Sequence, residues 1–214
     1  MKPVSRTRKY QDATGARFGR KDFRMLRRTK KVFNPAEYLA MEEVADYKSE
    51  YFNGEIFAML GGTPDHSSVA VNLLGALGTR LAAKPCRVFN SDMRLHIESN
   101  TLYTYPDVMV ICGKIELVKR RNDTVTNPAL IVEVLSESTR DYDRGLKFNL
   151  YKQVPSLQEY VVVDPENPRV ECYRRGADDQ WVVEMIADLS ATVRLASVAC
   201  EISLHEIYRK VSWA

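Results

Sequence analysis

The chain has 214 residues, of which 45% are apolar and 28% are charged, as expected for one globular domain. This composition excludes wholesale disorder, a collagen-like fibre and a disulfide miniprotein, and no apolar run reaches the ~18 residues of a membrane span. The net charge of +3 hides an asymmetry, because residues 1–31 carry twelve Lys or Arg and two Asp, whereas the other 183 residues carry 19 basic and 26 acidic groups. A mildly acidic domain over residues 32–214 therefore follows a strongly basic tail.

The basic tail, residues 1–31, has no apolar periodicity, and repulsion between its like charges predicts that it is disordered or only transiently helical. It can be a solvated extension, a stretch upstream of a true start at Met25, or an arm that contacts nucleic acid. An organelle transit peptide is a further alternative, whereas the tail lacks the apolar segment of a secretory signal.

The cysteines of the chain are far apart and mostly lie in apolar surroundings. They are Cys86, Cys112, Cys172 and Cys200. No Cys-x-x-Cys or His-x-x-x-His pairing occurs, which argues against a structural zinc site. We therefore expect buried free thiols and a cytoplasmic protein.

The first half of the domain predicts two helices around a hairpin. Asn34 and Pro35 are typical of a helix start and predict a helix over 35–45. Asn53-Gly54 predicts a tight hairpin turn that leads into a strand over 55–59. After the break at residues 61–64, apolar residues recur at helical spacing and predict a buried amphipathic helix over 66–83.

The second half alternates strands and helices. It predicts strands over 87–97, 103–112, 129–135, 160–163, 170–173 and 181–186, and helices over 140–153 and 204–211. The segment 129–135 is almost wholly apolar, which is typical of a central strand buried on both faces. Together these elements predict an α/β or α+β fold with one mixed β-sheet flanked by helices and extra antiparallel hairpins.

Two carboxylates stand out against this apolar background. Glu133 is the only charge in the run 129–135, and burying a lone carboxylate is costly unless a cation, a metal or strong hydrogen bonds compensate it. It could instead pair with a buried Arg or lie at an exposed strand end. Asp107 precedes another apolar strand, so the two residues could supply the oxygen ligands that Mg²⁺ or Mn²⁺ needs. Taken alone, however, Pro106-Asp107 is also a common turn dipeptide.

A third feature lies in the predicted helix after Glu133. Asp143, Lys147 and Tyr151 recur at i, i+4 and i+8, so they share one helix face that could project into the same cleft as Glu133. The alternative is an exposed Asp–Lys pair beside an interfacial Tyr.

Together these residues resemble the Uma family of bacterial endonuclease-like proteins, part of the PD-(D/E)xK, restriction-endonuclease-like superfamily. The resemblance spans residues 33–211, nearly the whole predicted domain. Six motifs in order carry it: Asn53-Gly-Glu55-Ile, Gly61-Gly-Thr-Pro-Asp-His66, Ser91-Asp-Met-Arg94, Tyr105-Pro-Asp107-Val, Asn127-Pro-Ala-Leu-Ile-Val-Glu133-Val-Leu-Ser136-Glu-Ser-Thr139 and Asp143-Arg-Gly-Leu-Lys147-Phe-Asn-Leu-Tyr151.

The resemblance implies a restriction-endonuclease-like core with a divalent-metal site on one sheet face. By analogy Asp107 and Glu133 are the two acidic residues of the motif, and Glu55 matches a further acidic position that could complete the metal shell. The superfamily pattern expects Lys two residues after Glu133, where this chain has Leu135. The family pattern replaces it with a helical Lys, which Lys147 matches. His66 matches a recurrent family position without an assigned role.

The activity implied by the resemblance is phosphodiester hydrolysis by a Mg²⁺- or Mn²⁺-dependent endonuclease. In this interpretation Lys147 orients or deprotonates the attacking water or stabilises the phosphorane, and Tyr151 supports Lys147 from the next turn. The expected partner is nucleic acid, with DNA favoured, no membrane, and a homodimer as one possible assembly. The alternatives are a catalytically silent binding module with the nuclease fold and a metal-dependent hydrolase of another phosphate ester.

Overall fold

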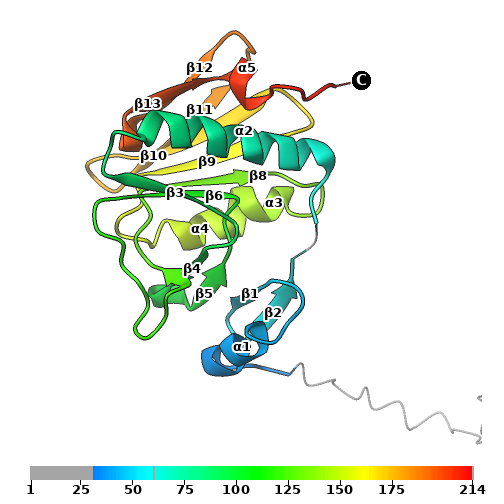
Figure 1. Cartoon of the computed structure of the whole chain (residues 1–214), viewed down its shortest axis with the longest axis vertical. Helices are drawn as coiled ribbons and strands as arrows, with labels where there is room; N and C mark the ends of the chain where they lie inside the picture. The colour runs from blue at the N-terminus through cyan, green and yellow to red at the C-terminus, as the bar shows by residue number, and fades with distance from the viewer. Residues whose placement is uncertain (1–30, 60, 214) are drawn as a thin grey trace, which may run out of the picture. The chain divides into compact units, whose positions relative to one another are not determined.

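A six-stranded sheet forms the centre of the computed structural model, which describes residues 31–59 and 61–213 (Figure 1). Its spatial order is β11 (Trp181–Ile186), β10 (Arg169–Arg175), β9 (Glu159–Asp164), β8 (Leu130–Val134), β6 (Val108–Cys112) and β3 (Cys86–Asn90). Strands β8 and β9 are parallel, and the other neighbours in this sheet are antiparallel. The mixed α/β sheet with added hairpins confirms the expected fold class.

One face of this sheet is covered by a long helix, α2 (Pro64–Leu81), whose Thr63 hydroxyl accepts a hydrogen bond from the His66 backbone amide and so caps the helix start. Apolar side chains of α2 pack with those of β6, β8, β9 and β10 in one core cluster. A two-stranded sheet of β12 (Thr192–Leu195) and β13 (Cys200–Ser203), followed by α5 (Leu204–Ile207), completes this layer. The sequence analysis did not predict β12 or β13.

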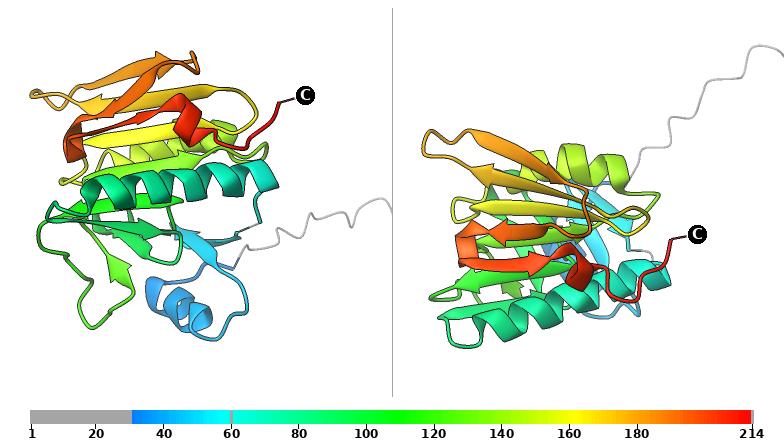
Figure 2. Two further views of the ribbon diagram at one scale, coloured as in Figure 1. Left: turned by 45° about the horizontal axis from the view of Figure 1, so that its top comes forward. Right: turned by 90° about the horizontal axis from the view of Figure 1, so that it is seen from above.

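The opposite face of the central sheet is covered by one helical segment made of α3 (Arg140–Tyr142), a π-helical turn η2 (Asp143–Lys147) and α4 (Phe148–Tyr151). Figure 2 shows the sheet between α2 on one side and this segment on the other. The segment connects the parallel strands β8 and β9, which need such a crossover. The helix predicted over 140–153 is therefore confirmed in place, with a π turn in its middle.

A second, five-stranded sheet lies on the side of α3 and α4. Its spatial order is β2 (Glu55–Ala58), β1 (Ser49–Phe52), β5 (Leu102–Thr104), β4 (Arg94–Ile97) and β7 (Thr124–Val125). Helix α1 (Pro35–Glu42) packs on β1, and Asn34 with Glu37 forms the expected capping box. Asn53 and Gly54 take positive φ angles of 47° and 88°, the backbone that a tight hairpin turn requires.

The prediction of one sheet is wrong, because two predicted strands are each divided between the two large sheets. The strand predicted over 87–97 separates into β3 and β4, and the strand predicted over 103–112 separates into β5 and β6. Residues 105–107, Tyr-Pro-Asp, interrupt the second, because Pro has no backbone N–H for a ladder. The chain thus passes from one sheet to the other directly before Asp107.

The expectation of four free thiols is also wrong. Cys86 and Cys112 lie directly opposite one another on β3 and β6 and form a disulfide, whereas Cys172 and Cys200 are buried and free. The spacing in the sequence does not indicate this pair, because 26 residues separate the partners. The predicted tail, apart from Lys31, lies outside the described residues. Within the described part of the chain, no helix has the length and apolar character needed to cross a membrane.

Reducing the Cys86–Cys112 disulfide is expected to lower the free energy of unfolding by about 2–4 kcal/mol, because the bond restricts a 26-residue loop in the unfolded chain. Urea denaturation with and without a reducing agent measures the difference. A Cys86→Ser/Cys112→Ser variant is the control and should not respond to the reductant. Equal midpoints for the oxidised and reduced wild type would contradict the expectation.

Candidate active site

The site begins with two carboxylates on neighbouring strands. The antiparallel register pairs Val108 with Val132, so the next pair in the same register is Asp107 with Glu133. Residues directly opposite one another in an antiparallel pair share a sheet face. This face of the sheet is the one covered by η2 and α4. Ile131 lies on the same face of β8 as Glu133, and it packs in the core cluster that includes residues of α4. The structure therefore brings Asp107 and Glu133 together, as the sequence analysis expected.

Glu133 is buried, and its carboxylate is held by two side chains from the helical segment. Its Oε1 accepts a hydrogen bond of 2.6 Å from the Tyr151 hydroxyl and lies 2.9 Å from Lys147 Nζ. Only 4% of the residue is exposed, so it is not at an exposed strand end, and its cation is a Lys rather than an Arg. Burial, together with the charges of Asp107 and Asp143, raises the pKa of Glu133 despite Lys147.

Lys147 places its ammonium among three carboxylates. Besides Glu133, Nζ lies 3.2 Å from Glu50 and 3.5 Å from Asp143, and the Lys147 side chain is only 8% exposed. Burial opposes the charged form of Lys147, but the carboxylates of Glu133 and Glu50 outweigh it and hold its pKa well above the ordinary value. The exposed Asp–Lys pair considered for the sequence is therefore wrong, and Lys147 points toward Glu133.

The π turn explains why Asp143, Lys147 and Tyr151 stay on one face of the helical segment. In a regular α-helix residues eight apart diverge by about 80° around the axis, because each residue turns the chain by about 100°. The wider turn from Asp143 to Lys147 counters this drift. Lys147 and Tyr151 therefore both contact Glu133, and Asp143 stays beside Lys147.

The hairpin β1–β2 adds an acidic residue that the sequence did not indicate. Glu50 on β1 lies beside Lys147, and the role of Glu55 on β2 in a metal shell stays a prediction. The tight turn fixes the pairing Phe52 with Glu55, so Glu55 lies on the same face of the hairpin as Glu50 but two residues nearer the turn. Thr104 donates a hydrogen bond to Glu50 and orients it. Sequence analysis missed Glu50 because its alternation with Glu55 becomes visible only when the hairpin register is known.

His66 lies on the other side of Asp107, in the first turn of α2. Its Nε2 is 3.4 Å from Asp107 Oδ2, and that same oxygen accepts a 2.8 Å hydrogen bond from the Val134 backbone amide. The interaction with Asp107 raises the pKa of His66, although burial opposes this. Gly62 permits the arrangement, because a Cβ at this position would lie 2.6 Å from His66 Nδ1.

The donors at this site fit a divalent metal by their chemistry. Carboxylate oxygens are the ligands that Mg²⁺ and Mn²⁺ prefer, and Asp143 Oδ1 is a buried acceptor without a hydrogen-bond partner. Over residues 31–59 and 61–213, no three His, Cys, Asp or Glu side chains are arranged to enclose a metal ion. Mg²⁺ commonly takes one or two protein carboxylates and fills its shell with water and substrate phosphate, so a pair of carboxylates such as Asp107 and Glu133 matches the number of protein ligands that it takes.

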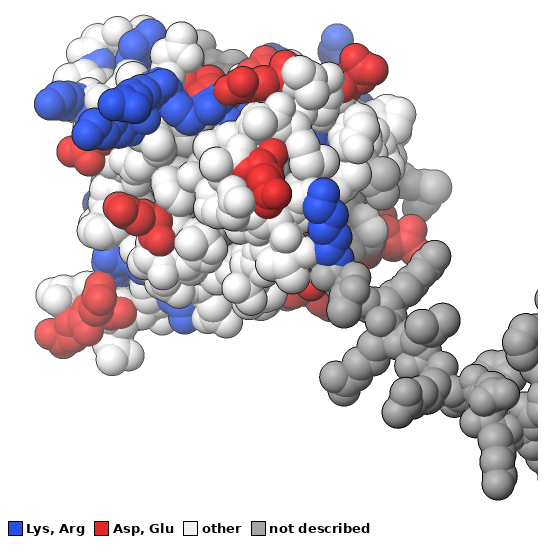
Figure 3. All heavy atoms as spheres, turned by 90° about the horizontal axis from the view of Figure 1, so that it is seen from below, with Lys and Arg blue, Asp and Glu red and all other residues white. Residues whose placement is uncertain are grey.

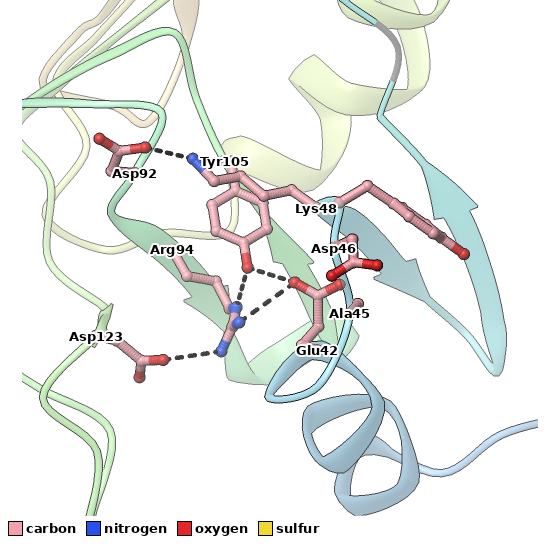
Figure 4. A pocket seen from close by; sticks show the side chains of 9 residues that line it. Glu42, Ala45, Asp46, Lys48, Asp92, Arg94, Tyr105 and Asp123 are labelled. Carbon is pink, nitrogen blue, oxygen red and sulfur yellow. Dashed lines mark hydrogen bonds and ion pairs between the residues drawn. The ribbon is translucent and has the colours of Figure 1, made fainter.

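Arg94, another cation in the six motifs, belongs to a separate cluster. Its guanidinium donates to the Tyr105 hydroxyl (2.8 Å) and lies 3.3 Å from both Glu42 and Asp123 (Figure 4). These side chains line a cavity of about 410 Å³ that also involves Lys48. Arg94 is buried and already balanced by two carboxylates, so Lys147 is the cation that adjoins Glu133.

Comparison with known proteins gives consistent results. Residues 35–205 match the Uma2 family, described as "Putative restriction endonuclease". The uncharacterized protein sll1609 of Synechocystis sp. is 38% identical over 172 residues, which cover 80% of this chain and 97% of that protein. A second Synechocystis protein, slr1290, is 36% identical over 180 residues, covering 84% and 93%.

A solved structure shares the fold. It is the crystal structure of "a putative nuclease belonging to DUF820" from Anabaena variabilis, with a TM-score of 0.66 and 20% sequence identity. The match covers 81% of this chain and 96% of that one. At this level of identity the likeness shows that the two chains share a fold.

Proposed function

The chain belongs to the Uma2 family, and from this membership and the site geometry we propose that it is an endonuclease that hydrolyses phosphodiester bonds with a divalent metal. Nucleic acid is the substrate class that a restriction-endonuclease family implies. The observation that carries the proposal is the position of Lys147. A buried ammonium from a helix lies 2.9 Å from the strand carboxylate Glu133, although the strand itself has Leu135 where the superfamily has Lys.

In the proposed mechanism, Asp107 and Glu133 hold Mg²⁺ or Mn²⁺. When bound, the ion lowers the pKa of a coordinated water and offsets charge on the scissile phosphate. Lys147 supplies a positive charge at the phosphate oxygens and donates a proton or hydrogen bond as negative charge develops. Tyr151 orients Glu133 through its 2.6 Å hydrogen bond, and His66 orients Asp107.

The charge of the domain sets a condition on this proposal. Residues 32–214 carry seven more acidic than basic groups, yet affinity for nucleic acid depends on neutralising phosphates. Figure 3 shows one face on which several Lys and Arg side chains lie together at one corner, with Asp and Glu both beside them and scattered over the rest of the face. Binding therefore has to come from local clusters of basic side chains, from the basic tail, or from both.

The proposal is tested by incubating the full chain with mixed DNA and RNA in the presence of Mg²⁺, Mn²⁺ or EDTA. Wild type is expected to cleave with metal and to be silent in EDTA. Asp107→Ala should lose cleavage by about 10²–10⁴-fold, as is typical when a group that acts directly in catalysis is removed. Asp178→Ala, at an exposed turn between β10 and β11, is the matched control and should cleave like wild type.

Four results would contradict the proposed metal-dependent nuclease. Metal-independent cleavage, or cleavage by Asp107→Ala at the wild-type rate, would place the activity elsewhere. Binding without cleavage under every metal condition would favour the silent binding module. Hydrolysis of small phosphate esters without cleavage of nucleic acid would favour the third alternative.

A further inference from the structure

A second cluster of charged side chains lies beside the candidate active site on the same helical segment. Arg140 and Arg144 project from α3 and η2 toward β9 and β10, whereas Asp143 and Lys147 face Glu133. With Arg169 at the start of β10, these two arginines line a cavity of about 540 Å³. The three guanidinium groups define what we call the arginine pocket.

The arginine pocket has more cations than buried carboxylates. Arg144 Nη2 and Arg169 Nη2 lie 2.9 Å and 3.0 Å from the same oxygen, Glu171 Oε1. Arg140 pairs with the buried Asp164 at 2.5 Å and with Glu166 at the exposed rim. Two guanidinium groups therefore share a single carboxylate, and their charge is only partly compensated.

The buried carboxylate holds these side chains in place without using all their donors. Burial opposes ionisation of Glu171, but hydrogen bonds from Arg144 and Tyr173 outweigh it and keep the pKa of Glu171 below its ordinary value. Arg169 Nε is buried and has no hydrogen-bond partner, although 40% of the Arg169 side chain is exposed. Fixed guanidinium groups with spare N–H donors are well suited to binding a phosphate.

The register of the sheet places the pocket next to the candidate active site. The pairing of Val134 with Val163 continues to Leu135 and Asp164, so Asp164 lies on the strand next to Glu133 and two residues further toward the C-terminal ends of β8 and β9. Neighbouring strands are about 4.8 Å apart, so β10, which carries Arg169 and Glu171, lies about 14 Å from β6 and its Asp107 end. One strand of B-form DNA rises about 3.4 Å per nucleotide, so this separation spans about four nucleotides.

We propose that the arginine pocket binds a backbone phosphate of the nucleic acid that flanks the phosphate at Asp107 and Glu133. The inference rests on the proposed nuclease function for its ligand, but its residues are distinct from the candidate catalytic ones. Arg144 and Arg169, which share one carboxylate, add the local positive charge that an acidic domain requires for binding nucleic acid. Glu171 competes with the phosphate for Arg144 and Arg169.

The test measures binding without cleavage, using the full chain and a labelled short DNA duplex in EDTA across a series of salt concentrations. Arg144→Gln/Arg169→Gln is expected to weaken binding by about tenfold or more and to reduce the slope of log K against log salt by about 0.9. Glu171→Gln should tighten binding by a few-fold, because it frees both guanidinium groups. Arg194→Gln, an exposed Arg on β12 whose carbonyl oxygen accepts a hydrogen bond from Arg174 of β10, is the matched control and should bind like wild type.

Opposite effects of the two pocket variants distinguish ligand binding from a structural role, since loss of folding would weaken binding in both. Thermal melting confirms that each variant is folded. Wild-type affinity in the double Gln variant, or weaker binding by Glu171→Gln, would overturn the proposal that the arginine pocket binds phosphate. If wild type binds DNA, the nuclease proposal is not affected by that result.

A second arm uses inorganic pyrophosphate alone and follows the melting temperature. If pyrophosphate stabilises wild type but not the double Gln variant while wild type fails to bind DNA, the pocket stands and the nuclease proposal falls. If wild type responds to neither probe, the pocket proposal is overturned as well.

Discussion

Lys147→Met is expected to reduce nucleic-acid cleavage by about 10²–10⁴-fold and to lower the free energy of unfolding by about 3–5 kcal/mol. Both effects have one cause, since Lys147 Nζ lies within 3.5 Å of the carboxylates of Glu133, Glu50 and Asp143. Removing the ammonium leaves these acids buried against one another. The sequence pattern alone would predict lost cleavage with little change in folding, and the burial of Lys147 changes that expectation.

The effect on folding and the effect on catalysis can be separated by neutralising the partner. Lys147→Met/Glu133→Gln should recover much of the stability, because fewer charges are then left unpaired, but it should not recover cleavage. Lys147→Arg should also fail in cleavage, because a planar guanidinium differs in shape and proton affinity from an ammonium. Lys152→Met, a half-buried Lys just beyond α4, is the matched control. Cleavage by Lys147→Met at the wild-type rate would show that the catalytic cation lies elsewhere, with Arg94 next to be tested.

Mn²⁺ is expected to stabilise the wild-type fold by about 2.7 kcal/mol when its concentration is about 100 times its dissociation constant, because an ion that binds only the folded state shifts unfolding by mass action. Glu133→Gln should lose most of this stabilisation, since an amide carries no charge to offset that of the ion. Urea denaturation with Mn²⁺ and with EDTA measures the difference without any substrate.

The control for this experiment is Glu201→Gln, an exposed acid on β13 far along the chain from Asp107 and Glu133, and it should keep the full response to Mn²⁺. Equal stabilisation of wild type and Glu133→Gln would show that the ion binds at another place. No stabilisation of wild type at any Mn²⁺ concentration would favour a fold that has kept its carboxylates without a metal.

The helices, strands and turns that depend on neighbouring residues could be predicted from the sequence alone. The all-apolar run around Glu133 indicates a strand buried on both faces, and β8 is buried along its whole length. Asn34 and Glu37 predict the start of α1, and Asn53-Gly54 predicts a hairpin, since these residue types satisfy backbone requirements within a few positions. The spacing of Lys147 and Tyr151 likewise indicates one helix face.

Contacts between residues far apart in the sequence become visible only in the tertiary structure. Glu50 reaches Lys147 because the hairpin register and the second sheet place it there. This register is not visible in the sequence, where only the family resemblance pointed to an acidic residue of the hairpin, Glu55. The Cys86–Cys112 disulfide depends in the same way on the pairing of β3 with β6.

The sequence did not predict the division of the strands between two sheets, for a related reason. Alternation of apolar residues predicts a strand but does not say which sheet it joins, so the passage between sheets before Asp107 left no periodic signal. The long-range pairings that decide between sheets are set by burial of whole faces against one another, with α2 on one side of the central sheet and the segment that carries Lys147 on the other. The charges at the site follow from those pairings, because one ammonium meets three acids only after all the elements are packed.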